Sequence, residues 1–344
     1  MTVRSGLVLR SGRMADNVSR FHMTCLAAID SDEDELMLSS SGGAFSVLAR
    51  RMFDLGGVVY GHAFDDGFHV GCVRAENFDE LSAIRGSKYV QSDMGDAIAS
   101  VGRDLRAGRE VLFSGTPCQV DGLLAFLNGP QDGLLTVDII CHGVPSQAFF
   151  ADCMREEFSD QLISLRFRDK REGWGCGGGG ATVLRAGVKK DVPFSPEISY
   201  YYKRFLVGDV YRESCYRCPY AGGERPGDFT IGDFWGIDVD GSGLDARRGI
   251  SVVIANTAKA EALIPYVKCE TSWAERPLEE AVYGNDQLMR PSPRLGSRDV
   301  VLERWREEGI GVLEGEYRRS TLLSSKKWLA KRAVKKFLRG VLGR

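Results

Sequence analysis

The amino-acid sequence predicts a mixed α/β fold, with a mainly parallel-sheet core and helices, a β-rich C-terminal region and a terminal basic amphipathic helix. Three observations support this prediction. Short apolar segments alternate with segments of helical periodicity as far as about residue 160, which is the pattern of α/β folds. Beyond that point, β-rich segments are interrupted by glycine. The chain has 344 residues, 43% of them hydrophobic, and can bury a large core in one big domain or two modest ones.

The first part of the chain contains the alternation of helices and strands. The loop Ser39–Gly43 precedes the first apolar-periodic segment, and Gly56 and Gly57 end it. We expect helices at residues 44–55, 79–84, 93–105 and 119–127. We expect strands at residues 58–60, 110–114 and 134–140. Because ligands bind beyond the carboxyl ends of parallel strands, the residues that follow these strands are candidates for a functional site.

The second part of the chain is richer in β-structure. We expect strands at residues 164–168, 181–185 and 251–254, and a helix at residues 258–267. This change of texture places a boundary near residue 160.

The cysteine content and the lack of an apolar leader predict a cytoplasmic protein. No run of about 18 apolar residues is present, and the odd number of nine cysteines argues against complete disulfide pairing. The net charge of −2 includes a basic C-terminal segment, so the rest of the chain is acidic. Nucleic-acid binding is therefore not expected.

The C-terminal segment, residues 326–344, carries eight basic residues and no acidic residue. Apolar residues recur there at roughly helical spacing: Trp328, Leu329, Val334, Phe337, Leu338, Val341 and Leu342. Two interpretations remain open. The helix either lies on the anionic inner face of a membrane as a peripheral contact, or packs on the body of the protein with its basic face in solvent.

Four cysteines occur in local sequences that are suited to orienting their thiol groups towards a ligand. Cys118 follows Ser-Gly-Thr-Pro and Cys141 begins Cys-His-Gly-Val-Pro, each after an expected strand. Cys215 and Cys218 form a Cys-x2-Cys pair, which can chelate one centre from a single turn. We expect these four thiolates to bind one metal centre, and their spacing fits a zinc ion nearly as well as a [4Fe-4S] cluster.

The remaining cysteines are interpreted as small buried hydrophobic residues. They are Cys25, Cys72, Cys153, Cys176 and Cys269. His142 directly follows a metal-binding candidate, and two roles are open for it. It is either a ligand or proton donor, or a hydrogen-bonded neighbour of the metal ligands.

Three segments rich in glycine and hydroxyl groups precede expected helices. They contain the candidate cofactor-binding residues Ser40, Ser41, Gly42, Gly43, Gly86, Ser87, Lys88, Tyr89, Ser114, Gly115 and Thr116. Free backbone N–H groups at helix N-termini bind phosphate. In this interpretation Lys88 stabilises negative charge on a reduced flavin and Tyr89 stacks on the flavin ring. The alternative is that each segment is only an N-cap with a turn glycine.

Eight motifs occur in a fixed order between residues 38 and 290. They are Ser40-Ser-Gly-Gly43, Gly57-Val-Val-Tyr-Gly61, Arg85-Gly-Ser-Lys-Tyr-Val-Gln-Ser92, Phe113-Ser-Gly-Thr-Pro-Cys-Gln119, Cys141-His-Gly-Val-Pro145, Phe167-Arg-Asp-Lys170 with Gly173-Trp174, Cys215-x2-Cys218 and Ile231-Gly-Asp-Phe-Trp-Gly236. With this set, the chain resembles the beta-subunit family of coenzyme F420 hydrogenases and dehydrogenases.

The resemblance implies four regions. A family N-terminal domain at residues 38–160 would hold the flavin and half of the cluster site, and a family C-terminal domain at residues 161–290 would supply the Cys-x2-Cys half. An N-terminal extension, residues 1–37, and a helical tail, residues 291–344, would flank them.

The resemblance also implies two cofactors, FAD and a [4Fe-4S] cluster. The four motif cysteines would bind the cluster, and the three glycine-rich segments would surround the flavin, with Asp233 near them. Lys88, Tyr89 and His142 would act at the reacting centre.

The chain departs from the family pattern in two places. Many bacterial relatives begin with a ferredoxin-like segment, whose clusters need several cysteines. Residues 1–37 of this chain contain a single cysteine, Cys25. We therefore expect electrons to come from a separate ferredoxin-like donor or partner subunit. The glycine-rich residues 175–180, which include Cys176, also differ from the polar run usual after Gly-Trp.

We expect an FAD-dependent iron–sulfur oxidoreductase that passes electrons through the cluster and FAD to a small-molecule hydride acceptor. That acceptor is coenzyme F420 or another two-electron carrier, and a redox step in surface-polysaccharide biosynthesis is one candidate. Two alternatives stay open: a non-catalytic electron-transfer subunit, and a zinc-stabilised assembly or glycan-related protein without flavin.

Overall fold

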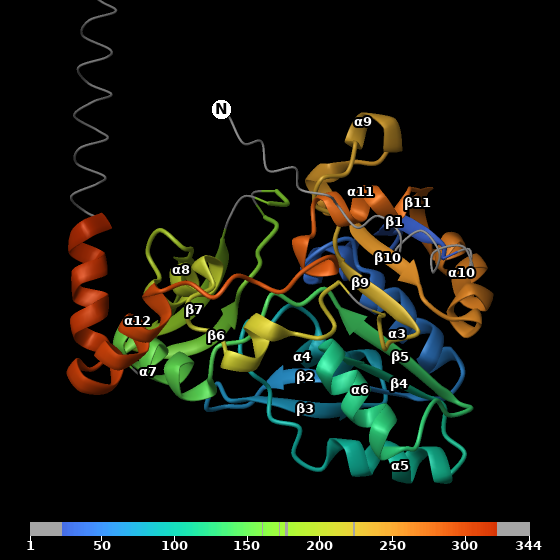
Figure 1. Ribbon diagram of the computed structural model, residues 1–344, viewed down its shortest axis with the longest axis horizontal. Coiled ribbons are helices and arrows are strands. Elements are labelled where there is room, and N and C mark those ends of the chain that lie inside the picture. The colour runs from blue at the N-terminus through green and yellow to red at the C-terminus, as the bar shows by residue number, and fades with distance from the viewer. Residues whose placement is uncertain (1–22, 160, 172, 176–177, 223, 322–344) are drawn as a thin grey trace, which may run out of the picture.

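Eight strands form the central sheet of the computed structural model, which describes residues 23–159, 161–171, 173–175, 178–222 and 224–321 (Figure 1). Across the sheet, the strands are β11 (Thr271–Glu275), β1 (Cys25–Asp30), β10 (Ser251–Ala255), β9 (Phe229–Asp233), β5 (Leu134–Ile139), β4 (Val111–Gly115), β2 (Val58–Phe64) and β3 (Val70–Ala75). β9, β5, β4 and β2 run parallel to one another, and the outer pairs are antiparallel. The predicted α/β fold with a parallel core is confirmed.

Five strands end at the same edge of this sheet. β1 runs in the direction of the four parallel strands, because β10 is antiparallel to both β1 and β9. The edge therefore gathers the segments that follow Asp30, Phe64, Gly115, Ile139 and Asp233. Open α/β sheets bind their ligands at such an edge.

Helices cover both faces of the central sheet. One face packs against α3 (Ala44–Asp54), α4 (Phe78–Ile84) and α10 (Ala258–Glu270). The other face packs against α5 (Ala97–Arg106), α6 (Pro117–Phe126), α2 (Glu33–Leu38) and α11 (Leu278–Tyr283). Consecutive residues of β2 show why: Val58 faces α5 and α6 while Val59 faces α3 and α4, since strand side chains alternate between faces.

A second, antiparallel sheet lies beside the central one (Figure 1). Its strands, in order, are β6 (Leu162–Arg166), β7 (Gly179–Arg185) and β8 (Val188–Phe194). It shares an aromatic-rich core with α7 (Gln147–Phe158), α8 (Tyr200–Val207) and α12 (Ser297–Glu308). The shorter helices are α9 (Val239–Ser242), η1 (Glu213–Arg217), η2 (Ala246–Arg248) and η3 (Asp286–Leu288), and residues 310–321 are also helical.

The predicted elements occur where the sequence placed them, with their ends shifted by a few residues. Strands β1, β3, β8, β9 and β11 were not predicted. For β1, the sequence Cys-Leu-Ala-Ala-Ile-Asp contains alanines of low β-propensity, yet every residue of it is buried. The central sheet takes strands from both sides of residue 160, and the proposed domain limits stay a prediction.

Two further predictions concern the membrane. Among the described residues, no helix is both long and apolar enough to span a bilayer. The basic segment 326–344 lies outside the described residues.

Candidate cluster and flavin site

Cys118 lies at the start of α6, immediately beyond the parallel strand β4. Thr116 and Gln119 form a capping box, in which the Gln119 side chain accepts a hydrogen bond from the Thr116 backbone N–H at 2.9 Å. Pro117 occupies the first turn, where its missing N–H costs nothing. The thiol is exposed, 3.1 Å from the Thr116 hydroxyl. The local sequence thus holds this sulfur at a helix N-terminus, which attracts negative charge.

The segment that follows β5 contains Cys141 and is hydrogen-bonded to the segment that contains Cys215. The backbone N–H of Arg212 donates to the carbonyl of Val144 at 2.9 Å. Burial raises the pKa of Cys215, and a hydrogen bond from the Val144 N–H to its sulfur opposes that shift. The η1 segment, which carries Cys215, is therefore fixed to the chain just after Cys141.

Gly143 lets this segment pass close to an aromatic ring. Its φ is +123°, and a Cβ atom there would lie 2.5 Å from the ring of Tyr211. Pro145 pairs with Tyr211 in an isolated antiparallel bridge. The glycine of the Cys-His-Gly motif is thus required by packing as well as by backbone conformation.

The four predicted metal ligands are electrostatic neighbours. Burial, together with the charges of Cys215, Cys118 and Cys218, raises the pKa of Cys141 to about 12. The pKa of Cys215 is likewise raised by burial and by the charges of Cys118 and Cys218. Three segments that are distant in sequence thus bring four sulfurs into one region. Within the described ranges, no three or more His, Cys, Asp or Glu side chains are grouped so as to hold a single metal ion.

Four cysteine thiols are a donor set that both a [4Fe-4S] cluster and a zinc ion can take. Zinc binds sulfur at about 2.3 Å, so its four ligands must crowd around one point. A [4Fe-4S] cluster takes its four cysteines on separate irons and leaves them further apart. Four gathered thiolates repel one another, and positively charged iron would offset that cost. The cysteines present therefore fit a [4Fe-4S] cluster.

Asp233 ends β9 at the same sheet edge and organises a second group. Its carboxylate accepts a hydrogen bond from Nε1 of Trp174 at 2.7 Å and lies 3.7 Å from the guanidinium of Arg168. Burial lowers the pKa of His142 and the charge of Asp233 opposes that shift, so these side chains are neighbours. Trp174 stacks on Trp235 with ring centroids 4.6 Å apart. Asp233 thus links the Gly-Trp motif to the residue that follows Cys141.

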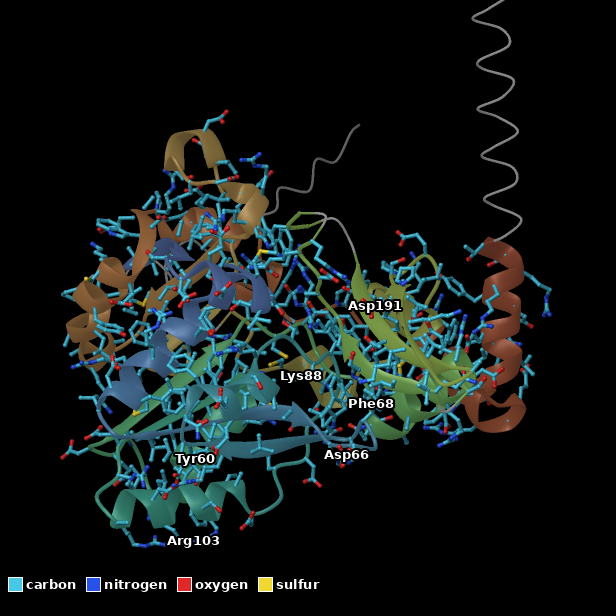
Figure 2. All side chains as sticks on the ribbon, turned by 180° about the vertical axis from the view of Figure 1, so that it is seen from behind. Tyr60, Asp66, Phe68, Lys88, Arg103 and Asp191 are labelled. Carbon is cyan, nitrogen blue, oxygen red and sulfur yellow. The ribbon has the colours of Figure 1, made fainter. Side chains whose placement is uncertain are left out.

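Lys88 caps a helix. Its ammonium donates to the carbonyls of Ala83, Ile84 and Arg85 at 2.9, 2.8 and 2.8 Å, at the C-terminal end of α4. An ammonium has three donors, and all three are used. Burial lowers the pKa of Lys88 to about 7. Lys88 lies near the middle of the molecule (Figure 2), but its predicted contact with a flavin stays a prediction.

Tyr89 stacks on a side chain of the aromatic core. Its ring lies 4.3 Å from that of Phe205 at an interplanar angle of 7°, and 5.0 Å from the ring of Phe167. Its carbonyl accepts a hydrogen bond from the hydroxyl of Tyr201 at 2.6 Å. Because protein occupies one ring face, stacking on a flavin would have to use the other.

The Ser-Ser-Gly-Gly segment packs tightly on the central sheet. The hydroxyl of Ser41 donates to the carbonyl of Ile250 at 2.8 Å, and the carbonyl of Gly42 accepts from the N–H of Asp30 at 2.7 Å. A Cβ atom on Gly42 would lie 2.1 Å from the carbonyl oxygen of Ala28. Packing alone therefore explains why residue 42 is glycine.

The first two glycine-rich segments contact each other. The hydroxyl of Ser40 accepts a hydrogen bond from the N–H of Ser87 at 2.8 Å. Gly43 and Gly86 have φ values of +86° and +80°, which favour glycine. A Cβ atom on Gly43 would lie 2.6 Å from the Cβ of Asp30, so this side chain covers the start of α3.

The third segment lies beside a histidine that belongs to none of the predicted site residues. Ser114 and Gly115 are the last residues of β4, and His62 lies on the neighbouring strand β2. Nδ1 of His62 is 2.7 Å from the hydroxyl of Ser92. Burial, reinforced by the positive charge of Lys88, lowers the pKa of His62 to about 4 and keeps it neutral at physiological pH. The predicted strand ended at residue 60, whereas β2 continues to Phe64. A prediction of the longer strand would have placed His62 near the sheet edge.

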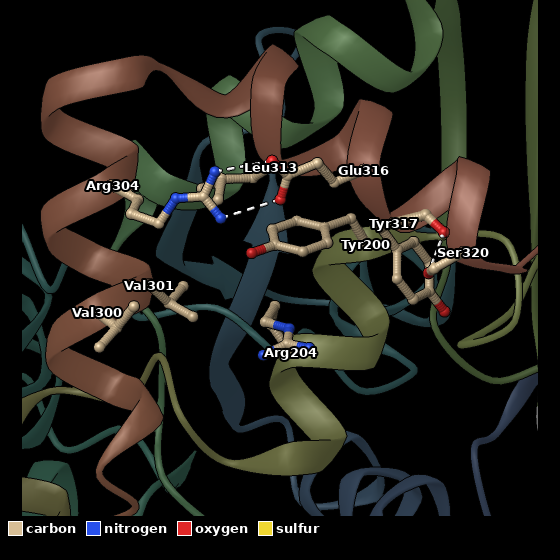
Figure 3. Close-up of a pocket in the computed structure, with 9 residues that line it drawn as sticks. All are labelled: Tyr200, Arg204, Val300, Val301, Arg304, Leu313, Glu316, Tyr317 and Ser320. Carbon is tan, nitrogen blue, oxygen red and sulfur yellow. Dashed lines mark hydrogen bonds and ion pairs between the residues drawn. The ribbon is translucent and has the colours of Figure 1, made fainter.

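A cavity of about 310 Å³ lies away from these residues, between α8, α12 and the helical residues 310–321 (Figure 3). Tyr200 and Tyr317 line it together with Arg304, whose guanidinium is paired with Glu316. No predicted site residue lines this cavity.

Comparison with known proteins decides the family. Residues 108–281 match the family model for the C-terminal part of the coenzyme F420 hydrogenase/dehydrogenase beta subunit. The chain belongs to this family. The matched segment contains all four cysteines and Asp233. The resemblance found in the sequence is confirmed. The family to which this chain belongs consists of oxidoreductase subunits.

A chain of known structure illustrates the similarity in fold across most of both chains. It belongs to the F420-reducing [NiFe] hydrogenase complex from Methanosarcina barkeri, studied by xenon derivatization. A chain of that complex matches with a TM-score of 0.52 and 16% sequence identity, over 82% of this chain and 91% of its own length. No curated protein matches this chain.

Within this family member, the other cysteines differ in environment. Cys25 and Cys153 are buried, as predicted, and burial raises the pKa of Cys25 to about 12. Cys72 is half-buried. Cys269 is exposed near the end of α10, so the prediction that it is buried was wrong. Cys176 lies outside the described residues.

Proposed function

We propose that this protein is an iron–sulfur flavoprotein oxidoreductase that passes electrons between a [4Fe-4S] cluster, FAD and a two-electron acceptor. One observation carries the proposal: Cys118, Cys141, Cys215 and Cys218 come from three separate segments and converge beyond the ends of β4 and β5. Four neighbouring thiols from separate segments are the kind of soft donor set that binds iron–sulfur clusters.

In this proposal the four cysteines hold the cluster, and FAD, when bound, converts single electrons to hydride equivalents. The flavin assignment rests on the family resemblance. Ser40, Ser87, Thr116 and Asp233 lie on segments at the sheet edge and are proposed to position it. Lys88 is proposed to contribute positive charge from the end of α4, and the neutral imidazole of His142 to donate or accept a hydrogen bond.

The electron donor is proposed to be a ferredoxin-like protein or a partner redox subunit. Support comes from the similar fold found in a multi-subunit hydrogenase complex. The acceptor is proposed to be coenzyme F420 or another small hydride acceptor, and a role in surface-polysaccharide biosynthesis belongs to the same proposal. A non-catalytic relay subunit is the alternative that the same match favours, and it would reduce no soluble acceptor without its partner.

A cytoplasmic location is also proposed, with residues 326–344 as the segment that would contact the inner face of a membrane. The alternating apolar and basic residues of that segment support this part of the proposal.

The ligand assignment is tested by serine substitution of each cysteine in protein purified without oxygen. We expect about four irons per chain in the wild type. Cys118→Ser, Cys141→Ser, Cys215→Ser and Cys218→Ser should each lower iron content. Cys269→Ser, at an exposed position outside the set, is the matched control and should keep the iron.

Two results would contradict the proposal. Iron content that survives Cys215→Ser would show that the ligands are assigned wrongly. A colourless protein that holds about one zinc per chain would instead support the zinc-stabilised alternative.

A further inference from the structure

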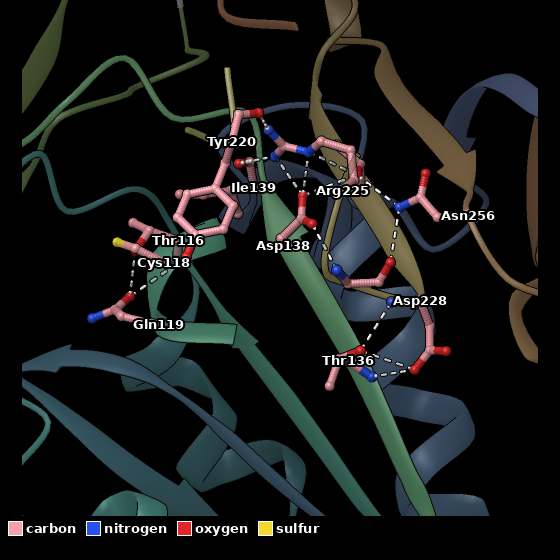
Figure 4. Close-up of polar contacts among 12 residues, drawn as sticks. Thr116, Cys118, Gln119, Thr136, Asp138, Ile139, Tyr220, Arg225, Asp228 and Asn256 are labelled. Carbon is pink, nitrogen blue, oxygen red and sulfur yellow. Dashed lines mark hydrogen bonds and ion pairs between the residues drawn. The ribbon is translucent and has the colours of Figure 1, made fainter. Parts of the chain in front are cut away.

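The convergence of the four cysteines raises the question of what holds their segments together. Cys118 belongs to α6, Cys141 follows β5, and the Cys215–Cys218 segment belongs to η1 and the turn after it. No disulfide ties the cysteines to one another, since all eight described cysteines are free. Side chains of residues 220 and 225, just after the Cys-x2-Cys pair, reach both of the other segments (Figure 4).

We propose that Tyr220 and Arg225 are positioning residues that brace the Cys215–Cys218 segment against helix α6, which carries Cys118, and against the end of β5, which Cys141 follows. This inference rests on the proposed function, because it takes the four cysteines as the ligands of one cluster. It adds the residues that set the spacing of those ligands.

Tyr220 forms the contact with the segment of Cys118. Its hydroxyl donates to Oδ2 of Asp121 at 2.7 Å. Asp121 lies on α6 three residues after Cys118, so both side chains project from the same side of the helix. Figure 4 shows the Tyr220 ring beside Thr116 and Cys118. One tyrosine therefore links α6 to the turn after Cys218.

Arg225 forms the contact with the segment of Cys141. Its Nη2 donates to the carbonyl of Ile139, two residues before Cys141, at 2.8 Å. Its Nη1 donates to the carbonyl of Tyr220 at 3.2 Å. A single guanidinium thus binds both the end of β5 and the turn that carries Tyr220. Only arginine has enough donors in a rigid plane to make these contacts at once.

Asp138 anchors the guanidinium. Its Oδ1 accepts from Nε and Nη2 of Arg225 at 3.0 and 2.5 Å. The carboxylate is fully buried, and its other contacts come from the hydroxyl of Thr230 and the N–H of Gly227, each at 2.9 Å. Because a buried carboxylate needs a charged partner, Asp138 keeps Arg225 in one orientation. Asp138 therefore holds the guanidinium of Arg225 in place, and the guanidinium contacts the two segments next to the cysteines.

The chain supplies matched controls for both side chains. Tyr60 makes the same kind of bond as Tyr220, donating to Asp104 at 2.6 Å, but between β2 and α5. Arg50 resembles Arg225, because it pairs with a fully buried carboxylate, Asp30, through side chains of similar exposure. The hydrogen bonds of both control side chains go to segments that carry none of the four cysteines.

The test uses full-length protein purified without oxygen, in the variants Tyr220→Phe and Arg225→Lys and the controls Tyr60→Phe and Arg50→Lys. The readouts are the rate of iron loss to a chelator, the electron paramagnetic resonance line shape of the reduced cluster, and the free energy of unfolding. We expect the first two variants to lose iron about 10 to 100 times faster than wild type and to change the line shape. The controls should change unfolding free energy without changing either iron readout.

Each outcome decides the inference. Iron loss and line shape that match wild type in both Tyr220→Phe and Arg225→Lys would overturn the brace while leaving the cluster assignment standing. Equal acceleration in the controls would also overturn it, because the effect would then follow global stability. Tyr220→Phe removes a single hydroxyl and keeps the ring, so it remains informative if Arg225→Lys fails to fold. Wild-type protein without iron would overturn the proposed function and this inference together.

Discussion

Gly42→Ala tests whether the Ser-Ser-Gly-Gly segment is shaped by packing. The new Cβ atom would lie 2.1 Å from the carbonyl oxygen of Ala28 and 2.4 Å from the backbone nitrogen of Ser251. These two residues are partners in the β1–β10 ladder, so neither can move without breaking strand pairing. The loop must move instead, away from the bonds that Ser41 makes to Ile250 and that Gly42 accepts from Asp30.

The expected loss follows from these contacts. Two hydrogen bonds contribute about 0.5–1.5 kcal/mol each. Forcing an extra methyl group into a packed site costs about 1–3 kcal/mol. Gly42→Ala should therefore lower the free energy of unfolding by roughly 2–6 kcal/mol.

The assay is urea unfolding of flavin-free protein, followed by tryptophan fluorescence. Gly122→Ala is the control, because Gly122 is exposed on α6 and its new Cβ would meet nothing within 4 Å. That variant should gain up to about 1 kcal/mol from helix propensity. If Gly42→Ala unfolds at the wild-type urea concentration but binds less flavin, the packing argument is refuted and the glycine serves the cofactor.

Two further predictions concern residues near the site. The pKa of Lys88 is lowered to about 7 from 10.5, so between those values the unfolded chain holds a proton that the folded chain lacks, and stability rises with pH. Lys88→Met should flatten this rise by up to about 1.4 kcal/mol per pH unit, and equal slopes in urea titrations from pH 7 to pH 10 would contradict it. Trp174→Phe keeps an aromatic ring on Trp235 but removes the donor to Asp233, and should cost about 1–3 kcal/mol in unfolding free energy. An unchanged unfolding midpoint in that variant would show that Asp233 finds another partner.

Local sequence patterns were sufficient to predict the elements next to Cys118 and Cys141. Short apolar strands followed by Cys118 and Cys141 placed both thiols at the carboxyl edge of a parallel sheet, where they lie. The Cys-x2-Cys spacing made Cys215 and Cys218 candidate ligands, and that role stays a prediction. These features are local, so the sequence alone could reveal them.

The contacts between distant residues could not be predicted. Arg225 and Asp138 are 87 residues apart, and neither stands in a motif that names the other. Lys88 looked suited to a cofactor, but its donors bind carbonyls of the helix just before it. Cys269 has an ordinary helical context, and only the packing of α10 exposes it. Side-chain direction depends on tertiary contacts that a linear pattern does not contain.

The measurement that tests the central claim most directly is the content of iron, acid-labile sulfide and flavin in full-length protein purified without oxygen. The convergence of Cys118, Cys141, Cys215 and Cys218 predicts about four irons and four sulfides per chain, with FAD as the released flavin. Protein that contains neither iron nor sulfide after anaerobic purification and reconstitution would contradict the claim that these four thiols hold a [4Fe-4S] cluster.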